Sequence, residues 1–403
     1  MRVLLVTAGS RGDIEPFLAL ARRLGADGHD AVVALPDRSG AVTDGVATIS
    51  LGADFTRVIE QQGVSPIRAM RSLRSVIRPI MRAVLVGTAR AIADTSPDVV
   101  VYHPKALSAP MAADASRIPH VVAELVPAMT PTRAFPAAGT VPFDIGPLNR
   151  ATYAAATAGR RMFSAEMDAA ATALGLSERP RLDSPAASNL VPVSSTLLSR
   201  PADWPATTTL TGAWVDKPEG APNLDLDLEE FLRLGDVLYA GFGSMASPGA
   251  ARRGRAVLQA ARSNGMRVLM ATGLGGLEID GDLAGSDVLT RTSVDHRSVL
   301  PRVTAALHHG GVGTVHAAVG AGVPSVVVPF IADQPFWGAR LADAGLAAAL
   351  IRASRLTAER LARALADVDR LRPATIAASQ RMRGEDGTGT AVRILEQVTR
   401  RRV

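Results

Sequence analysis

The chain has 403 residues, with 47% hydrophobic and 20% charged side chains, so it is long enough for two globular domains and too apolar to be disordered. It contains no cysteine, which excludes a disulfide framework and a thiolate metal site. The net charge is +6, but aromatic residues make up only 4% and are not interleaved with basic ones, so we expect no nucleic-acid partner.

The first half of the chain alternates between strand-like and helix-like segments. The apolar run over residues 2–7 predicts a strand. Because this run is too short for a signal peptide or a membrane span, we expect a cytoplasmic protein. A glycine turn and a helix over 14–24 follow this strand. Further strands are predicted at 30–36 (DAVVALP), 97–104 (PDVVVYHP) and 118–124 (IPHVVAE).

Arginines recur every three or four residues within 68–90, so they form one face of a helix. This stripe consists of Arg68, Arg71, Arg74, Arg78 and Arg82. Three interpretations remain open for it: a solvated face, a surface for an anionic acceptor, or a patch that contacts a membrane. Nearly all other positive charge is also arginine, because the only lysines are Lys105 and Lys217.

The alternation restarts near residue 236. Strands are predicted at 236–244 (DVLYAGFGS), 266–273 (MRVLMATG), 287–292 (DVLTRT), 304–309 (TAALHH) and 324–329 (PSVVVP), with a helix over 250–264 after the first of them. Continuous apolar strands separated by helices are typical of parallel sheets covered on both faces. Two such series predict an α/β protein with two doubly wound domains. The expected divisions are a first domain 1–205, a linker 206–222, a second domain 223–385, and a C-terminal helix 386–403 that packs back on the first domain.

Ligands of open parallel sheets bind at the carboxyl ends of the strands, so the turns that follow the strands should carry the chemistry. These turns are AGSRGD (8–13), GFGSM (241–245), TSVDH (292–296), HHGGVGT (308–314) and FIADQP (330–335). Two sheets that face each other would place the site in a cleft between the domains.

The turn at 308–314 is the richest in glycine. Gly310, Gly311 and Gly313 permit conformations that other residues resist, and the N–H groups of a helix that begins at Thr314 would favour an anion by ~0.3–1 kcal/mol. Phosphate is the usual ligand at such a helix end, although the glycines could instead serve only close strand–helix packing. No Walker sequence is present. Neighbouring residues of a strand point to opposite faces, so we expect one of His308 and His309 in the core and no metal site.

The segment HHGGVGTVHAAVGAGVPSVVVPFIADQPFWGARLADAGLA resembles the donor-binding signature of GT-B fold, family 1-type glycosyltransferases. The branch is that of actinobacterial enzymes that modify antibiotics of the vancomycin-aglycone type, and sterol glucosyltransferases share the motif. GSRGDIEPFLALARRL and YAGFGSM resemble the same branch in the same order. The likeness covers both domains and is weakest over 55–200. Val315 stands where the branch commonly has a second threonine, which removes one hydroxyl from the phosphate site.

The resemblance implies an inverting, metal-independent enzyme without a cofactor. It would move a sugar from a TDP-deoxysugar or UDP-glucose to a hydroxyl of an aglycone. The implied diphosphate contacts are Ser244, His309, Gly310, Gly311, Gly313 and Thr314, and the implied contacts to the base are Ser293 and Val294. Asp333 and Gln334 would bind the sugar hydroxyls, as a carboxylate and an amide can, unless Asp333 merely begins a turn before Pro335. We interpret the acidic triplet Asp225-Leu226-Asp227 as a solvated turn or a helix start.

Transfer to a hydroxyl needs a general base, and the resemblance implies Asp13 for this role, with Ser10 and Gly12 near the cleft. The alternative is that Asp13 only caps a helix that begins at Ile14. Pro16 would then occupy the third helical position, so no capping box would form.

Other functions are less consistent with the sequence. A nicotinamide dehydrogenase is disfavoured because Gly9 and Gly12 lack the G-x-G-x-x-G spacing. A non-catalytic, glycosyltransferase-like helper protein remains an alternative. The expected acceptor is a polyketide or peptide aglycone, with a lipid or sterol as the second choice. Whether the protein is a monomer or a homodimer, whether it contacts a membrane, and whether it forms O- or C-glycosides all stay open.

Overall fold

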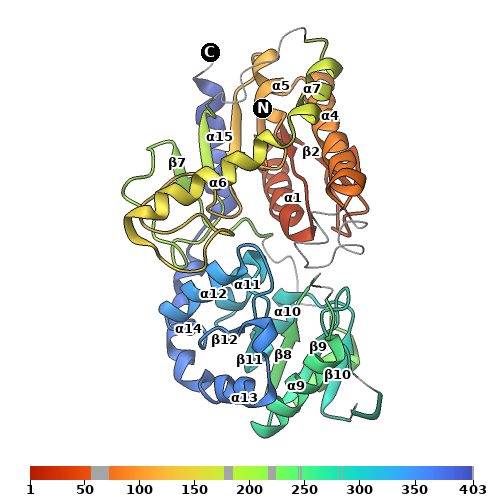
Figure 1. The fold of residues 1–403 in the computed structure, drawn as a ribbon, viewed down its shortest axis with the longest axis vertical. Coiled ribbons are helices and arrows are strands. Elements are labelled where there is room, and N and C mark those ends of the chain that lie inside the picture. Colours follow the sequence, from red (N-terminus) through yellow and green to blue (C-terminus); the bar gives the residue numbers. More distant parts are fainter. Residues whose placement is uncertain are drawn as a thin grey trace. The chain divides into compact units, whose positions relative to one another are not determined.

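The computed structural model describes residues 1–55, 72–176, 185–216, 224–243, 245, 247–279, 281–283 and 285–401. The chain divides into two compact units (Figure 1). The first unit combines Met1–Lys217 with Glu385–Val403, and the second is Pro218–Gly384. In the described part of the chain, no helix has both the length and the apolar character that a membrane crossing requires.

The first unit contains a seven-stranded parallel sheet in the order β3-β2-β1-β4-β5-β6-β7. Its strands are β1 (Arg2–Val6), β2 (Asp30–Asp37), β3 (Ala47–Asp54), β4 (Val99–Tyr102), β5 (His120–Ala123), β6 (Ser188–Val191) and β7 (Thr208–Leu210). The strands expected at 2–7, 30–36, 97–104 and 118–124 are β1, β2, β4 and β5. Because β7 pairs with β6, residues 208–210 of the expected linker belong to the first sheet.

Helices cover both faces of this sheet, as the alternation of side chains along β1 requires. Val3 and Leu5 pack in one core with α1 and α15, whereas Leu4 and Val6 pack in another core with α4. The described helices of the unit are α1 (Arg11–Ala26), α4 (Arg78–Thr95), α5 (Ala109–Ala115), α6 (Asn149–Arg161), α7 (Ser164–Ala173) and α15 (Gly387–Arg400). A π-helical turn, η1 (Leu73–Ile77), leads into α4, and a 3-10 turn, η2 (Gly146–Leu148), precedes α6.

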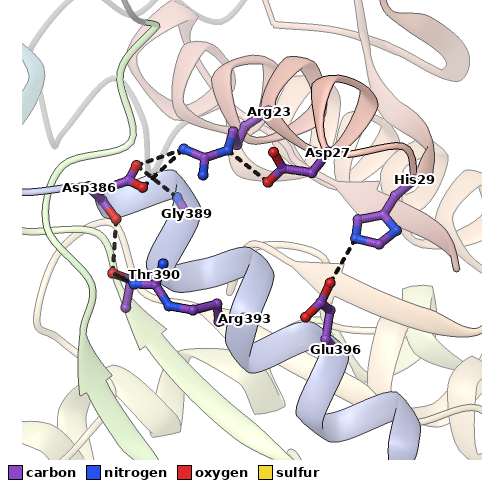
Figure 2. Close-up of polar contacts among 8 residues, drawn as sticks. All are labelled: Arg23, Asp27, His29, Asp386, Gly389, Thr390, Arg393 and Glu396. Carbon is purple, nitrogen blue, oxygen red and sulfur yellow. Dashed lines mark hydrogen bonds and ion pairs between the residues drawn. The ribbon is translucent and has the colours of Figure 1, made fainter.

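The last helix, α15, packs on α1 of the first unit (Figure 2). The Arg23 guanidinium contacts Asp27 through Nε at 2.8 Å and Asp386, the N-cap of α15, through Nη1 at 2.8 Å. Farther along, His29 Nε2 lies 3.2 Å from Glu396 Oε1. On the apolar side, Leu395 is fully buried in the core that it shares with α1. Both polar and apolar contacts therefore join the end of the chain to its beginning.

The second unit contains a five-stranded parallel sheet in the order β10-β9-β8-β11-β12. The strands are β8 (Val237–Gly241), β9 (Arg267–Ala271), β10 (Val288–Arg291), β11 (Ala305–His308) and β12 (Ser325–Val327), each within a range expected from the sequence. The helices are α8 (Leu226–Arg233), α9 (Ala250–Ser263), α10 (His296–Val299), α11 (Val312–Gly320), α12 (Gln334–Asp343), α13 (Ala358–Ala366) and α14 (Val368–Arg383). The described part of the unit also contains the 3-10 turns η3 (Gly281–Leu283), η4 (Leu300–Arg302) and η5 (Ala353–Arg355). The prediction of two doubly wound parallel sheets is confirmed.

Each sheet reverses its strand order at one point, which is where doubly wound folds bind ligands. In the first unit the point lies between β1 and β4, where Val6 pairs with Tyr102. In the second unit it lies between β8 and β11, where Gly241 pairs with His308. The turns that follow these four strands carry most of the candidate site residues.

The arginine stripe is only partly described, because Arg68 and Arg71 lie outside the described residues. Arg74 is exposed in η1 and Arg82 is exposed on α4. Arg78 instead turns toward α7: its Nη2 donates to the carbonyl of Met162 at 3.1 Å, and its Nη1 lies 3.8 Å from the carboxylate of Glu166. At least one arginine of the stripe therefore joins α4 to α7.

Candidate active site

The helix α1 begins at Arg11 rather than at Ile14, and Ser10 is its N-cap. The interpretation of Asp13 as the N-cap was therefore wrong, because the helix takes in Gly12 and Asp13 as its second and third residues. Asp13 Oδ2 accepts from the backbone N–H of Ser10 at 2.8 Å, and Ser10 and Asp13 together form a capping box. An acidic group in the first turn also suits the helix dipole.

Two residues after β4 complete the surroundings of the Asp13 carboxylate. Lys105 Nζ lies 2.9 Å from Oδ2, and His103 Nε2 lies 3.4 Å from Oδ1. The backbone N–H of Lys105 donates to His103 Nδ1 at 3.1 Å. A neutral imidazole with an accepting Nδ1 carries its proton on Nε2, so His103 presents an N–H to Asp13. Neither residue was among the candidates expected from the sequence, although His103 lies at the end of the expected strand 97–104 and Lys105 follows it directly.

These contacts set the charge of Asp13. Burial would raise the pKa of the Asp13 carboxyl, but the charge of Lys105 and the hydrogen bond from His103 outweigh burial and leave the pKa far below its usual range. Burial also lowers the pKa of His103, so this imidazole is neutral near pH 7. The Asp13 side chain remains 21% exposed. The first unit thus presents an ionised carboxylate that a solvent-borne molecule can reach.

Gly9 makes room for this group. Its φ is +136°, a conformation that side chains with a Cβ rarely adopt, and a Cβ there would lie 2.6 Å from Lys105 Nζ and collide with the Asp13 carboxylate. The glycine is therefore needed for the contact between Asp13 and Lys105.

In the second unit, β11 ends at His308 and α11 begins at Val312, two residues before the expected start at Thr314. Gly311 is the N-cap, so the first turn of α11 contains Val312, Gly313 and Thr314. A Cβ placed on Gly313 would meet nothing within 4 Å. The first turn of this helix is therefore open on the side of Gly313, as an anion site requires.

The two adjacent histidines have different environments. His308 is fully buried, its Nε2 lies 3.0 Å from Ser325 Oγ, and its Nδ1 accepts from the backbone N–H of Gly310 at 3.1 Å. Burial lowers the pKa of His308 to about 3. It is the core histidine that the strand alternation predicts.

The His309 ring packs between the turn after β8 and the start of α11. A Cβ on Gly311 would lie 2.5 Å from Nε2 of His309, and one on Gly243 would lie 3.4 Å from Cε1. Its Nδ1 is buried and has no hydrogen-bond partner within the described part of the chain. Burial lowers the pKa of His309 to about 4. A neutral imidazole with unused hydrogen-bonding capacity thus stands beside the open helix turn.

The turn before α12 touches the same region, since a Cβ on Gly310 (φ +91°) would lie 3.0 Å from the carbonyl oxygen of Gln334. The Gln334 side-chain oxygen accepts from the N–H groups of Phe330 and Ile331, at 2.7 and 3.0 Å. Asp333 Oδ2 accepts from Trp337 Nε1 at 2.8 Å. The side chains of both residues expected at the sugar therefore form hydrogen bonds within residues 330–337.

The remaining candidate residues are Ser244, Ser293, Val294 and the acidic triplet. Ser244 lies outside the described residues. Ser293 is exposed and Val294 is partly buried after β10, just before Asp295, the N-cap of α10. In the acidic triplet, Asp225 caps α8 through the N–H of Leu228 and is the helix start that the sequence suggested. Over the described ranges, no group of three or more histidine or carboxylate residues is arranged to hold a metal ion.

Comparisons with known proteins agree with this architecture. Residues 3–131 match the glycosyltransferase family 28 N-terminal domain, and residues 286–391 match the C-terminal domain of the erythromycin biosynthesis protein CIII-like family. The solved structure of the kitacinnamycin glycotransferase superposes with a TM-score of 0.74 at 19% identity and covers 98% of both chains. That of the glycosyltransferase VinC in complex with dTDP has a TM-score of 0.67 at 19% identity and covers 100% of both chains. The fold is that of the GT-B glycosyltransferases.

Relatives of higher identity define the family. Glycosyltransferase GtfC of Amycolatopsis orientalis is 31% identical over 98% of this chain and 97% of its own length. O-mycaminosyltylonolide 6-deoxyallosyltransferase of Streptomyces fradiae is 34% identical over 90% of this chain and 88% of its own. A sterol 3-beta-glucosyltransferase of Cryptococcus neoformans is 28% identical over 91% of this chain, which spans only 25% of that longer protein. The chain belongs to this family of antibiotic and sterol glycosyltransferases.

Proposed function

We propose that the protein transfers a sugar, with inversion and without a metal ion, from a nucleoside-diphosphate sugar to a hydroxyl of a natural-product aglycone. Asp13 is the general base of this proposal. The observation that carries it is the ionised, partly exposed Asp13 carboxylate at the strand-order reversal of a chain that belongs to the glycosyltransferases.

The reaction needs two tasks from the protein. Asp13 takes the proton of the acceptor hydroxyl while its oxygen attacks the anomeric carbon, and the bond from that carbon to the diphosphate oxygen breaks. The departing diphosphate gains negative charge, which the N–H groups at the start of α11 and the His309 imidazole can stabilise. In this proposal the first unit supplies the base and the second unit supplies the diphosphate site, together with Ser244 and Thr314.

A thymidine diphosphate sugar is the favoured donor. VinC, which shares the fold, is described with bound dTDP, and the Streptomyces fradiae relative is named for a deoxysugar. UDP-glucose is the alternative. A polyketide or peptide aglycone is the first acceptor to test, because residues 286–391 match an erythromycin biosynthesis family. A sterol is the second, because sterol glucosyltransferases are also relatives. Contacts of Ser293 and Val294 with the base, and of Asp333 and Gln334 with the sugar, remain part of the proposal.

The decisive experiment combines binding with turnover. We expect calorimetry in the presence of EDTA to detect TDP or UDP at micromolar Kd and to detect no NAD. Asp13→Asn should lower transfer by about 10²-fold or more and leave the Kd of the nucleotide unchanged, because the substitution lies in the other unit. Full activity of Asp13→Asn would remove Asp13 from the base role. Nucleotide binding without turnover by the unaltered protein, across the aglycones tested, would favour a helper function.

A further inference from the structure

The cation that contacts Asp13 is unusual for this chain. Only two of its 44 cationic side chains are lysines, and Lys105 is one of them. Lysine carries a compact charge that can approach one carboxylate oxygen, whereas the planar guanidinium of arginine favours a two-oxygen contact. The narrow space beside Gly9, where a Cβ would lie 2.6 Å from Lys105 Nζ, suits the smaller group.

The contacts on Asp13 are distributed unequally between its two oxygens. Oδ2 receives the N–H of Ser10 at 2.8 Å, its hydroxyl at 3.2 Å, and Lys105 Nζ at 2.9 Å. Among the described residues, the contact of Oδ1 is with His103 Nε2, at 3.4 Å. A carboxylate has about four lone-pair sites on its two oxygens. Oδ2 is therefore saturated, and the unused capacity lies on Oδ1.

We propose that Lys105 is a positioning residue for Asp13: by binding Oδ2 it fixes the carboxylate so that Oδ1 is the oxygen that receives the proton of the acceptor hydroxyl. The proposal rests on the proposed role of Asp13 as the base. In the transfer step, the O–H bond of the acceptor breaks, a new O–H bond forms at Oδ1, and the resulting neutral carboxylic acid keeps its contact with Lys105 through Oδ2. Lys105 itself contacts neither the acceptor nor the donor in this proposal.

The arrangement also sets the pH range in which the base works. Lys105 and His103 are the titratable groups that act on the Asp13 carboxylate within the described residues. Arg11, on the same helical turn, is paired with Glu15 instead. The ionisable groups between α1 and α15, Arg23 and His29 with their partners, lie at the other end of α1. Removal of Lys105 would leave burial, which raises the pKa of Asp13, opposed only by His103 and the cap.

The sign of the effect follows directly. The folded protein holds the pKa of Asp13 below its usual range, so the base stays ionised, and active, as the pH falls. Without Lys105 the pKa of Asp13 rises, and activity is lost on the acid side at a higher pH. A residue that only supported the fold would change stability or the amount of active protein, and it would not move this limb of the pH profile.

The test compares kcat/KM from pH 5 to pH 9 for the full-length protein and its Lys105→Met, Lys105→Arg and Arg11→Met variants. We expect kcat/KM of the unaltered protein to stay flat down to pH 5, because the pKa of Asp13 lies far below that range. In Lys105→Met the acid limb should rise into the measured range, so that kcat/KM at pH 5 falls by about threefold or more. Lys105→Arg keeps a positive charge near the carboxylate, so its acid limb should move less than that of Lys105→Met. Arg11→Met removes a positive charge from the helical turn that carries Asp13, without a contact to the carboxylate, so its profile should stay flat down to pH 5.

The Kd of TDP and the activity of Asp13→Asn separate the possible failures. The Kd of TDP should be unchanged in every variant, which shows that the second unit is intact, and Lys105→Arg provides a folded substitute if Lys105→Met does not fold. An inactive Asp13→Asn together with unaltered pH profiles of both Lys105 variants would overturn the role of Lys105 alone. A fully active Asp13→Asn would overturn the base, and the inference about Lys105 with it.

Discussion

The adjacent histidines at the end of β11 offer a sharp test, because substitution of one should change nucleotide affinity and substitution of the other should change stability. The His309 ring lies at the start of α11, where a Cβ on Gly311 would be 2.5 Å from Nε2, whereas both ring nitrogens of His308 are engaged in the core. We therefore expect His309→Ala to weaken nucleotide binding with little loss of stability. His308→Ala should destabilise the second unit.

The magnitudes follow from the contacts. A hydrogen bond to a charged group contributes about 1.5–3 kcal/mol net, so loss of the His309 contact to a diphosphate should raise the Kd of TDP about 10- to 150-fold. His308→Ala removes a fully buried ring and leaves the Ser325 hydroxyl and the Gly310 N–H without their partners. A cavity and two unsatisfied groups together should lower the free energy of unfolding by about 3 kcal/mol.

Calorimetry can measure both effects on the same samples. Titration with TDP gives the Kd of each variant, and differential scanning gives the unfolding transitions. The transition of the second unit is the one that TDP moves to higher temperature, since a ligand stabilises the unit that binds it. An unchanged Kd for His309→Ala would refute the diphosphate site at this turn. The assignment of His308 to the core would fail if its alanine variant kept the transition temperature and lost affinity.

Two other expectations concern the glycine beneath the base and the absence of a metal from the proposal. Gly9→Ala places a Cβ against Lys105 Nζ and the Asp13 carboxylate at φ +136°, so transfer should fall by about 10²-fold, as for Asp13→Asn, while TDP affinity is kept. Wild-type turnover by Gly9→Ala in a steady-state assay would mean that the Asp13–Lys105 contact is dispensable. If α11 and His309 alone balance the diphosphate charge, exhaustive treatment with EDTA should leave at least about half of the activity, and a loss that Mg²⁺ or Mn²⁺ restores would require a metal in the reaction.

The sequence predicted the elements with the clearest patterns. Continuous apolar strands such as β4 and β8, and the glycine turn at 310–313, have signals contained within a few neighbouring residues. β3 was missed because its exposed positions interrupt the apolar run, and β7 because it spans only Thr208–Leu210. The start of α1 was placed too late because Arg11, Gly12 and Asp13 show no apolar periodicity, although Ser10 and Asp13 have the spacing of a capping box.

The surroundings of Asp13 show a different limit. His103 and Lys105 meet Asp13 only because β4 lies beside β1 in the sheet, and no local window of sequence contains that information. The doubly wound order, once assumed, does bring the turns after β1 and β4 together. The available signal was therefore a polar pair at the end of the PDVVVYHP segment, with His103 inside it and Lys105 directly after it. The engagement of Gln334 with Phe330 and Ile331 depends on side-chain geometry, which the sequence does not specify.

The packing of α15 on α1 has a consequence for protein engineering. The second unit is an insertion: the chain leaves the first unit after Lys217 and returns to it at Glu385. A hybrid that takes everything after one junction from a relative would replace Leu395 and Asp386 as well, and would break the core and the ion pair that they share with α1. An exchange of the second unit between relatives should therefore use two junctions and keep the native ends of the recipient together.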